Sequence, residues 1–123
     1  MTRIESRVNL GIPDLLLAFK NPSKFVMLEV KVVKRGRKVA ISPHQVSFHM
    51  AHADMGCPTF IFVQYHPPGT VSVAKAEYML YRGSQAADLL RDGIDLEPLD
   101  SWPAAAPMWN MLRLRLTEKE NSV

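Results

Sequence analysis

Three charged side chains lie in or beside apolar runs of the sequence, where a charge is costly to bury. Asp14 stands near the start of "GIPDLLLAF", and both Glu29 and Lys31 lie inside "FVMLEVKVV". A buried carboxylate is tolerated only when something pairs with it. Two carboxylates can hold a divalent cation through hard oxygen ligands, and a nearby lysine can stabilise developing negative charge. These residue types therefore indicate a metal-assisted reaction.

The alternation of side chains along a strand decides whether these three charges can meet. Residues two apart point to the same face, so Glu29 and Lys31 share one face and the intervening aliphatic residues take the other. If the strand that follows Asp14 pairs beside this one, all three charges come together. A cation held there would keep positions for water and a phosphate, polarise a phosphodiester and lower the pKa of the bound water.

A helix is expected directly after these strands. In "SPHQ", Ser42 suits the N-cap and Pro43 suits the first helical position. The helix is expected to run to about Asp54 and to end at "MGCP", where glycine and proline forbid continuation. Gln45 and His49 are spaced so that they share one face of this helix.

The rest of the chain predicts strands with helices between and after them. Apolar runs predict strands over 14–19, 25–33 and 59–65, with further extended segments over 3–8, 39–41 and 71–81. A short helix is expected over 84–93, with Ser84 as its cap and Gly93 as its stop. A proline-rich link over 98–107 leads to 108–116, which suits a helix or a strand. The expected fold is α/β, a mixed central sheet flanked by helices, in one domain over 1–123.

The ordered set "GIPDLL", "LEVK" and "SPHQ" resembles the PD-(D/E)XK nuclease superfamily. Over roughly 3–115 the chain is similar to small phage-type members, the virus-type replication-repair nucleases and the Holliday-junction resolvases. The resemblance implies a restriction-endonuclease-like core and metal-dependent hydrolysis of DNA, either branched or duplex. A homing-type site-specific endonuclease and a non-catalytic DNA-binding protein that keeps the fold are the alternatives.

The resemblance also implies a role for each matching residue. Asp14 and Glu29 would bind Mg²⁺ or Mn²⁺, with the backbone carbonyl of Val30 as a third ligand. Lys31 would act near the attacking water, and Gln45 would steady Lys31 or the scissile phosphate. Many relatives add an acidic residue on an N-terminal helix, for which the chain before Asp14 is too short. The only upstream acid, Glu5, is expected in that place or in a surface role.

The basic residues are concentrated in one segment, although the net charge is only +3. The run "KRGRK" is expected to turn the chain after the strand of Glu29 and Lys31. It is either a solvated hairpin tip or a contact to the DNA backbone, and His49 is a further candidate for phosphate contact. The acidic segment 88–100 is expected to face away from DNA. The candidate DNA-binding residues of the run are Lys34, Arg35, Arg37 and Lys38.

The composition indicates where the protein is located and which partners it has. The single cysteine, Cys57, excludes an intrachain disulfide and favours a reducing environment. With no signal-peptide pattern and no bilayer-spanning run, we expect a cytoplasmic protein, in a bacterium or a phage-infected host cell. We expect neither a membrane partner nor an organic cofactor. A homodimer is expected because two cuts need two active sites. Part of the apolar tail from Trp102 to Leu116, which includes Trp109, is predicted to lie between the two protomers.

Overall fold

The computed structural model of the protein describes residues 2–3, 14–20, 23–69, 75–103 and 108–117. Its strands are β1 (Thr2–Arg3), β2 (Leu15–Lys20), β3 (Ser23–Val33), β4 (Thr59–Tyr65), β5 (Glu77–Arg82) and β6 (Asp100–Pro103). Its helices are α1 (Pro43–Asp54), α2 (Ala86–Asp92) and α3 (Met108–Thr117), and two 3₁₀ turns, η2 (Gly83–Gln85) and η3 (Gly93–Asp95), flank α2. In the described part of the chain, no helix is both long and apolar enough to cross a membrane.

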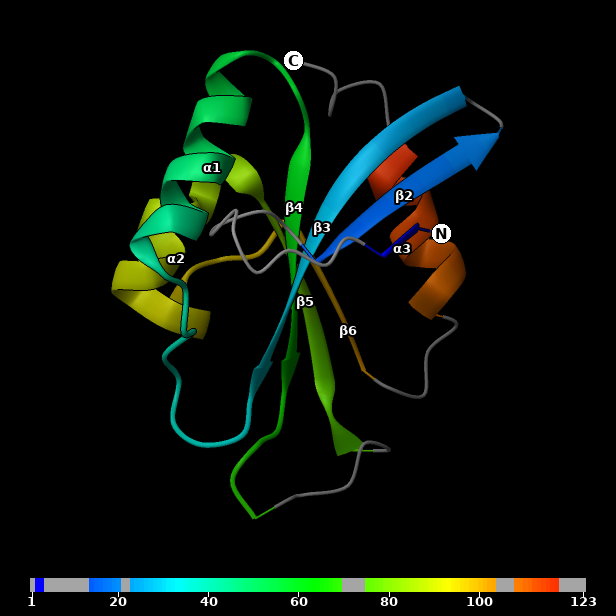
Figure 1. The fold of residues 1–123 in the computed structure, drawn as a ribbon. Helices are drawn as coiled ribbons and strands as arrows, with labels where there is room; N and C mark the ends of the chain where they lie inside the picture. The colour runs from blue at the N-terminus through cyan, green and yellow to red at the C-terminus, as the bar shows by residue number, and fades with distance from the viewer. Residues whose placement is uncertain (1, 4–13, 21–22, 70–74, 104–107, 118–123) are drawn as a thin grey trace.

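The strands form one mixed, open sheet in which spatial order follows chain order. Strands β2 to β6 make up its body, and the two-residue β1 extends the edge beside β2. Strands β3 and β4 are parallel, whereas the other neighbouring pairs are antiparallel. Parallel neighbours need a crossover connection, and α1 supplies it between β3 and β4 (Figure 1). The expectation of an α/β protein with a mixed sheet is confirmed.

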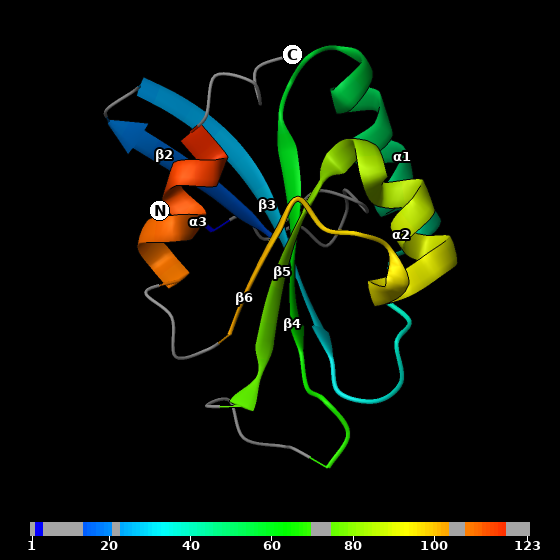
Figure 2. The ribbon, with the colours of Figure 1, turned by 180° about the vertical axis from the view of Figure 1, so that it is seen from behind.

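Helices cover both faces of the sheet. Helices α1 and α2 lie on one face and α3 lies on the other, as both views show (Figures 1 and 2). The central strand β4 is buried on both sides, which explains its continuous apolar sequence. Phe60 and Phe62 belong to the core beneath α3, whereas Ile61 and Val63 belong to the core beneath α1 and α2.

The connection between β3 and α1 differs from the expected one. Residues 39–41 join no strand, so "KRGRK" belongs to a β3–α1 loop and is no hairpin tip. Val39 and Ile41 are instead buried in the core beneath α1 and α2. Their apolar side chains therefore anchor the loop to the sheet by packing, without any ladder of backbone hydrogen bonds.

The start of α1 matches the sequence prediction, and the start of α2 does not. Ser42 caps α1 and Pro43 is its first residue, as expected. The helix predicted over 84–93 begins instead as the 3₁₀ turn η2, and α2 starts only at Ala86. Gly93 ends α2 as predicted, with a positive φ of 62° that a residue with a side chain rarely adopts.

The C-terminal segment resolves the ambiguity between helix and strand. It forms the helix α3, while the predicted proline-rich link contains the unexpected strand β6. Leu112 and Leu116, one turn apart, are buried with Trp102 in the core of the single chain. These three side chains therefore cover the second face of the sheet within the chain, and a dimer contact through other residues of the tail stays a prediction. The side chain of Trp109 lies outside the described residues.

Candidate active site

The two predicted carboxylates meet where β2 begins. The antiparallel register pairs Leu15 with Leu28, and one further step places Asp14 opposite Glu29. The Asp14 carboxylate is fixed there, because its Oδ2 accepts a hydrogen bond of 3.0 Å from the backbone N–H of Val30. The prediction that the strand after Asp14 pairs beside the strand of Glu29 is confirmed. Glu5, the expected additional acid, lies outside the described residues.

The polar backbone groups of Val30 face the side of β3 on which Asp14 lies. In an extended strand, the N–H and C=O of one residue point to the same side, and the Val30 N–H points to Asp14. On the opposite side of β3, every second residue forms backbone hydrogen bonds to the chain of β4. One example is the 2.9 Å bond that the His66 N–H donates to the Val33 carbonyl. Strand β2 begins only at Leu15, so its ladder does not reach Val30. The Val30 carbonyl is therefore directed to the side of β3 on which the Asp14 carboxylate lies.

Glu29 is the buried member of the pair, with only 1% of its surface exposed. Its Oε1 has no hydrogen-bond partner among the described residues. Burial raises the pKa of the Glu29 carboxyl above its ordinary value; His49 partly opposes this rise, and the neighbouring Asp14 adds to it. A carboxylate that is desolvated and short of partners is a group that a cation would stabilise.

Lys31 lies on the same face of β3, and the start of α1 holds its ammonium group. Its Nζ donates a hydrogen bond of 2.9 Å to Oε1 of Gln45. The same oxygen accepts from the backbone N–H of Ser42 at 3.0 Å, while Ser42 Oγ accepts from the Gln45 N–H at 3.1 Å. This capping box fixes the amide of Gln45. The structure thus brings together Lys31 and Gln45, which is one of the two contacts expected of Gln45.

His49 occupies a different place from the predicted one. It is fully buried between α1 and the sheet, so its assignment to phosphate contact is wrong. Its Nδ1 lies 2.7 Å from Thr59 Oγ1, and its Nε2 lies 3.9 Å from Glu29 Oε1. The sequence contained a signal for this position, because His49 follows Gln45 by one helical turn and so shares the face that covers Glu29. Thr59 was not identified from the sequence at all.

The basic loop is partly neutralised by the acidic segment that was expected to face away from DNA. Arg37 forms an ion pair with Asp95, and the Ile94 N–H donates a hydrogen bond of 2.8 Å to the Arg37 carbonyl. Part of segment 88–100 therefore packs beside the loop, and its orientation away from DNA stays a prediction. The other three candidate DNA-binding side chains are exposed: Lys34, Arg35 and Lys38.

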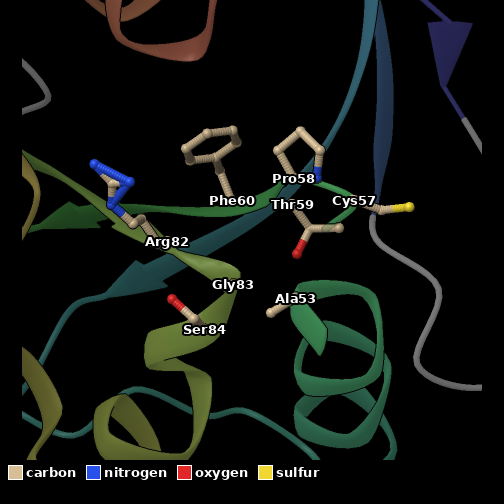
Figure 3. Close-up of a pocket in the computed structure, with 8 residues that line it drawn as sticks. All are labelled: Ala53, Cys57, Pro58, Thr59, Phe60, Arg82, Gly83 and Ser84. Carbon is tan, nitrogen blue, oxygen red and sulfur yellow. The ribbon is translucent and has the colours of Figure 1, made fainter. Parts of the chain in front are cut away.

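A small pocket of about 90 Å³ lies behind the C-terminal end of α1 (Figure 3). Ala53 of α1, Thr59 of β4 and the turn at Gly83 and Ser84 contribute to its walls. Thr59 connects this pocket to the carboxylates, because its hydroxyl contacts His49. The pocket therefore borders Thr59, which contacts one side of the His49 ring. Glu29 lies on the other side of that ring.

The oxygen atoms at the site suit a hard divalent cation. Nowhere in the described ranges do three or more His, Cys, Asp or Glu side chains gather as metal ligands. Asp14 and Glu29 nevertheless form a carboxylate pair with an unpartnered buried oxygen, and the Val30 carbonyl faces the same side. Mg²⁺ and Mn²⁺ prefer such oxygen ligands and commonly use few protein groups, with water and phosphate completing the shell. The residues present therefore fit Mg²⁺ or Mn²⁺.

Comparison of the chain with protein-family models gives no match, and comparisons with curated proteins and with solved structures give none either. What the protein does must therefore be inferred from its own residues. The residues that carry most weight are the four brought together at the meeting of β2, β3 and α1, namely Asp14, Glu29, Lys31 and Gln45.

Proposed function

We propose that the protein is a metal-dependent endonuclease that hydrolyses phosphodiester bonds in DNA, on a restriction-endonuclease-like core. The observation that carries the proposal is the carboxylate pair Asp14 and Glu29 next to a lysine held on the same face of β3. Two hard anionic ligands and one positioned cation are the groups that phosphodiester hydrolysis needs. The β3–α1–β4 crossover supports the proposed core, because it sets Gln45 above the strand that bears Glu29 and Lys31.

Each side chain has a distinct task in the proposed reaction. When bound, Mg²⁺ or Mn²⁺ would polarise the phosphodiester and lower the pKa of a coordinated water. Asp14, Glu29 and the Val30 carbonyl would hold the cation. The Lys31 ammonium would stabilise negative charge on the phosphate as water adds to phosphorus and one P–O bond breaks. Gln45 would restrict the ammonium to one orientation through the 2.9 Å hydrogen bond.

The test is cleavage of a supercoiled plasmid, a linear duplex and a four-way junction, with Mg²⁺, with Mn²⁺ and with EDTA. Asp14→Asn and Glu29→Gln should abolish cleavage while DNA binding persists, because each removes an anionic ligand and keeps the shape. Glu77→Gln is the matched control, since it makes the same change on an exposed residue of β5. Cleavage in EDTA, or cleavage by both site variants, would refute the proposal. DNA binding without any cleavage would favour the non-catalytic alternative.

The choice among the three DNAs identifies the substrate. The forms that we favour are a junction-resolving nuclease and a replication or repair nuclease, and preferential cutting of the four-way junction would support the first. Cutting of a linear duplex at one sequence would favour the homing-type alternative. The basic β3–α1 loop supports DNA as the polyanion, because Lys34, Arg35 and Lys38 are exposed.

The proposal includes a homodimer, because symmetric cuts in two strands require two active sites. Exposed apolar residues of the described chain provide candidate contact surface, among them Phe25 at 70% and Leu114 at 66% exposure. Light scattering at micromolar concentration should give twice the monomer mass. A monomer that still cuts both strands of a junction would contradict this part of the proposal.

A further inference from the structure

We propose that His49 is a positioning residue that orients the carboxylate of Glu29 and is itself fixed by the hydroxyl of Thr59. The three side chains come from α1, β3 and β4 and lie in contact beneath α1. This positioning role rests on contacts within the chain and does not require the proposed function. Only its consequence for cation binding rests on the proposed function.

The burial of these groups makes their mutual orientation important. His49 is 0% exposed, Glu29 is 1% exposed and Thr59 is 5% exposed. Among the described residues, Glu29 Oε1 and His49 Nε2 are both buried without a hydrogen-bond partner, and they lie 3.9 Å apart. An unpaired buried polar atom is costly. A small movement of either side chain would satisfy both atoms at once.

The chemistry of the contacts selects one tautomer of His49. Nδ1 lies 2.7 Å from Thr59 Oγ1, and a neutral imidazole carries its proton on only one nitrogen. A lone pair on Nε2 would face a carboxylate oxygen and repel it, so the proton belongs on Nε2. Nδ1 then accepts from the Thr59 hydroxyl, and Nε2–H faces Glu29 Oε1. A group that hydrogen-bonds to a metal-ligating side chain commonly fixes the orientation of that side chain.

A glycine keeps the Thr59 hydroxyl in place. A Cβ atom at Gly83 would lie 2.0 Å from Thr59 Oγ1, 3.0 Å from the Thr59 carbonyl and 3.2 Å from His49 Nδ1. Gly83 begins η2 and lies against the start of β4, where the Thr59 hydroxyl points toward this turn (Figure 3). The close approach leaves the hydroxyl little freedom other than its contact with His49. The set thus extends from Gly83 through Thr59 and His49 to Glu29.

Nitrogen-15 NMR of the full-length chain, labelled at histidine, tests the contact without any assay of activity. We expect His49 Nε2 to carry a proton and Nδ1 to accept from the Thr59 hydroxyl. Thr59→Val, which replaces the hydroxyl by a methyl of similar shape, should shift the Nδ1 resonance. Glu29→Gln should shift the Nε2 resonance and leave that of His52 unchanged. A proton on Nδ1, or an Nε2 resonance that ignores Glu29→Gln, would overturn the inference.

Calorimetric titration with Mg²⁺ alone tests the consequence. His49→Phe keeps a ring of similar size but removes the donor, and it should weaken Mg²⁺ binding by roughly 10- to 100-fold. His49→Gln, which restores a donor, should recover part of that loss. His52→Phe is the control on the same helix, where the His52 ring stacks on Phe48. Unchanged affinity in a folded His49→Phe variant would overturn the role in cation binding.

The two measurements separate this inference from the proposed function. A wild type that binds no Mg²⁺ would refute the metal-dependent nuclease, while the NMR result would still decide whether His49 orients Glu29. A wild type that binds Mg²⁺ while His49 carries its proton on Nδ1 would refute the inference and leave the nuclease standing.

Discussion

Lys31 and Gln45 are joined by a 2.9 Å hydrogen bond from Nζ to Oε1, and the same oxygen accepts the backbone N–H of Ser42. One amide therefore both caps α1 and holds the ammonium group of the candidate active site. The position of Lys31 depends on the helix start, so substitutions there should affect activity and stability to different degrees.

Gln45→Ala should lower kcat by roughly 10- to 100-fold, as the loss of a group that orients a catalytic side chain commonly does. It should also destabilise α1. Ser42→Ala is the matched control, because it removes only the Oγ that caps the helix, at a cost of about 1 kcal/mol. The backbone N–H of Ser42 and the Gln45 amide remain. Single-turnover rates and urea unfolding of both variants give the comparison. Equal loss of kcat in the two variants would show that the cap alone matters.

Glu29→Gln should change how stability depends on pH in the absence of cations. The pKa of Glu29 is raised in the folded protein above its ordinary value of 4.5, first by burial. A raised pKa contributes stability below the unfolded pKa, and this contribution is lost as the pH rises through the folded pKa. The wild type should therefore lose stability, relative to Glu29→Gln, as the pH rises from about 4.5 toward neutrality.

Urea unfolding in EDTA across that pH range measures the difference between the two proteins. Glu77→Gln, on an exposed part of β5, should instead follow the wild-type curve. Parallel curves for wild type and Glu29→Gln would mean that the Glu29 carboxyl titrates alike in the folded and unfolded chains.

Mg²⁺ should stabilise the wild type, because a ligand that binds only the folded state raises the free energy of unfolding. At a free concentration about one hundred times Kd, the gain is about 2.7 kcal/mol. Asp14→Asn should remove most of the gain, since it takes away one of the two anionic ligands. Thermal unfolding with and without Mg²⁺ provides the measurement. A gain that persists in Asp14→Asn would locate the cation elsewhere.

The salt dependence of DNA binding should distinguish the basic residues of the β3–α1 loop. Joint replacement of Lys34, Arg35 and Lys38 by alanine should flatten the slope of log K against log salt by about 0.9 for each lost phosphate contact. Arg37→Ala should alter the slope less, because Arg37 already pairs with Asp95. Lys20→Ala, at the far end of β2, serves as the control. An unchanged slope in the triple variant would assign the loop to solvent.

Gly83→Ala should destabilise the protein by about 1 to 3 kcal/mol, the usual cost of overpacking. The added Cβ would lie 2.0 Å from Thr59 Oγ1. Thr59→Ala combined with Gly83→Ala should recover part of the loss, because the closest of the clashing atoms is then absent. Ser84→Ala, at the exposed neighbouring residue, should have little effect. Urea unfolding of the single and double variants measures the coupling, and strictly additive losses would contradict it.

Much of the candidate site followed from the sequence because its signals are local. Alternation on a strand put Glu29 and Lys31 on one face, and the pattern of Ser42, Pro43 and Gln45 specified the start of α1. These features depend on residues that are near neighbours in the chain. Sequence also determined that β4 is central, because only a strand covered on both faces needs a run as apolar as "TFIFVQY".

Contacts between distant segments were decided only by the tertiary structure. The packing of α1 on the sheet buried His49 against Thr59 and Glu29, and the pairing of Arg37 with Asp95 joined segments of opposite charge. Trp102, Leu112 and Leu116 became core because the second face of the sheet needed a cover. Apolar side chains are buried wherever the fold leaves a face open, and the sequence alone does not specify whether that cover comes from the same chain or from a partner.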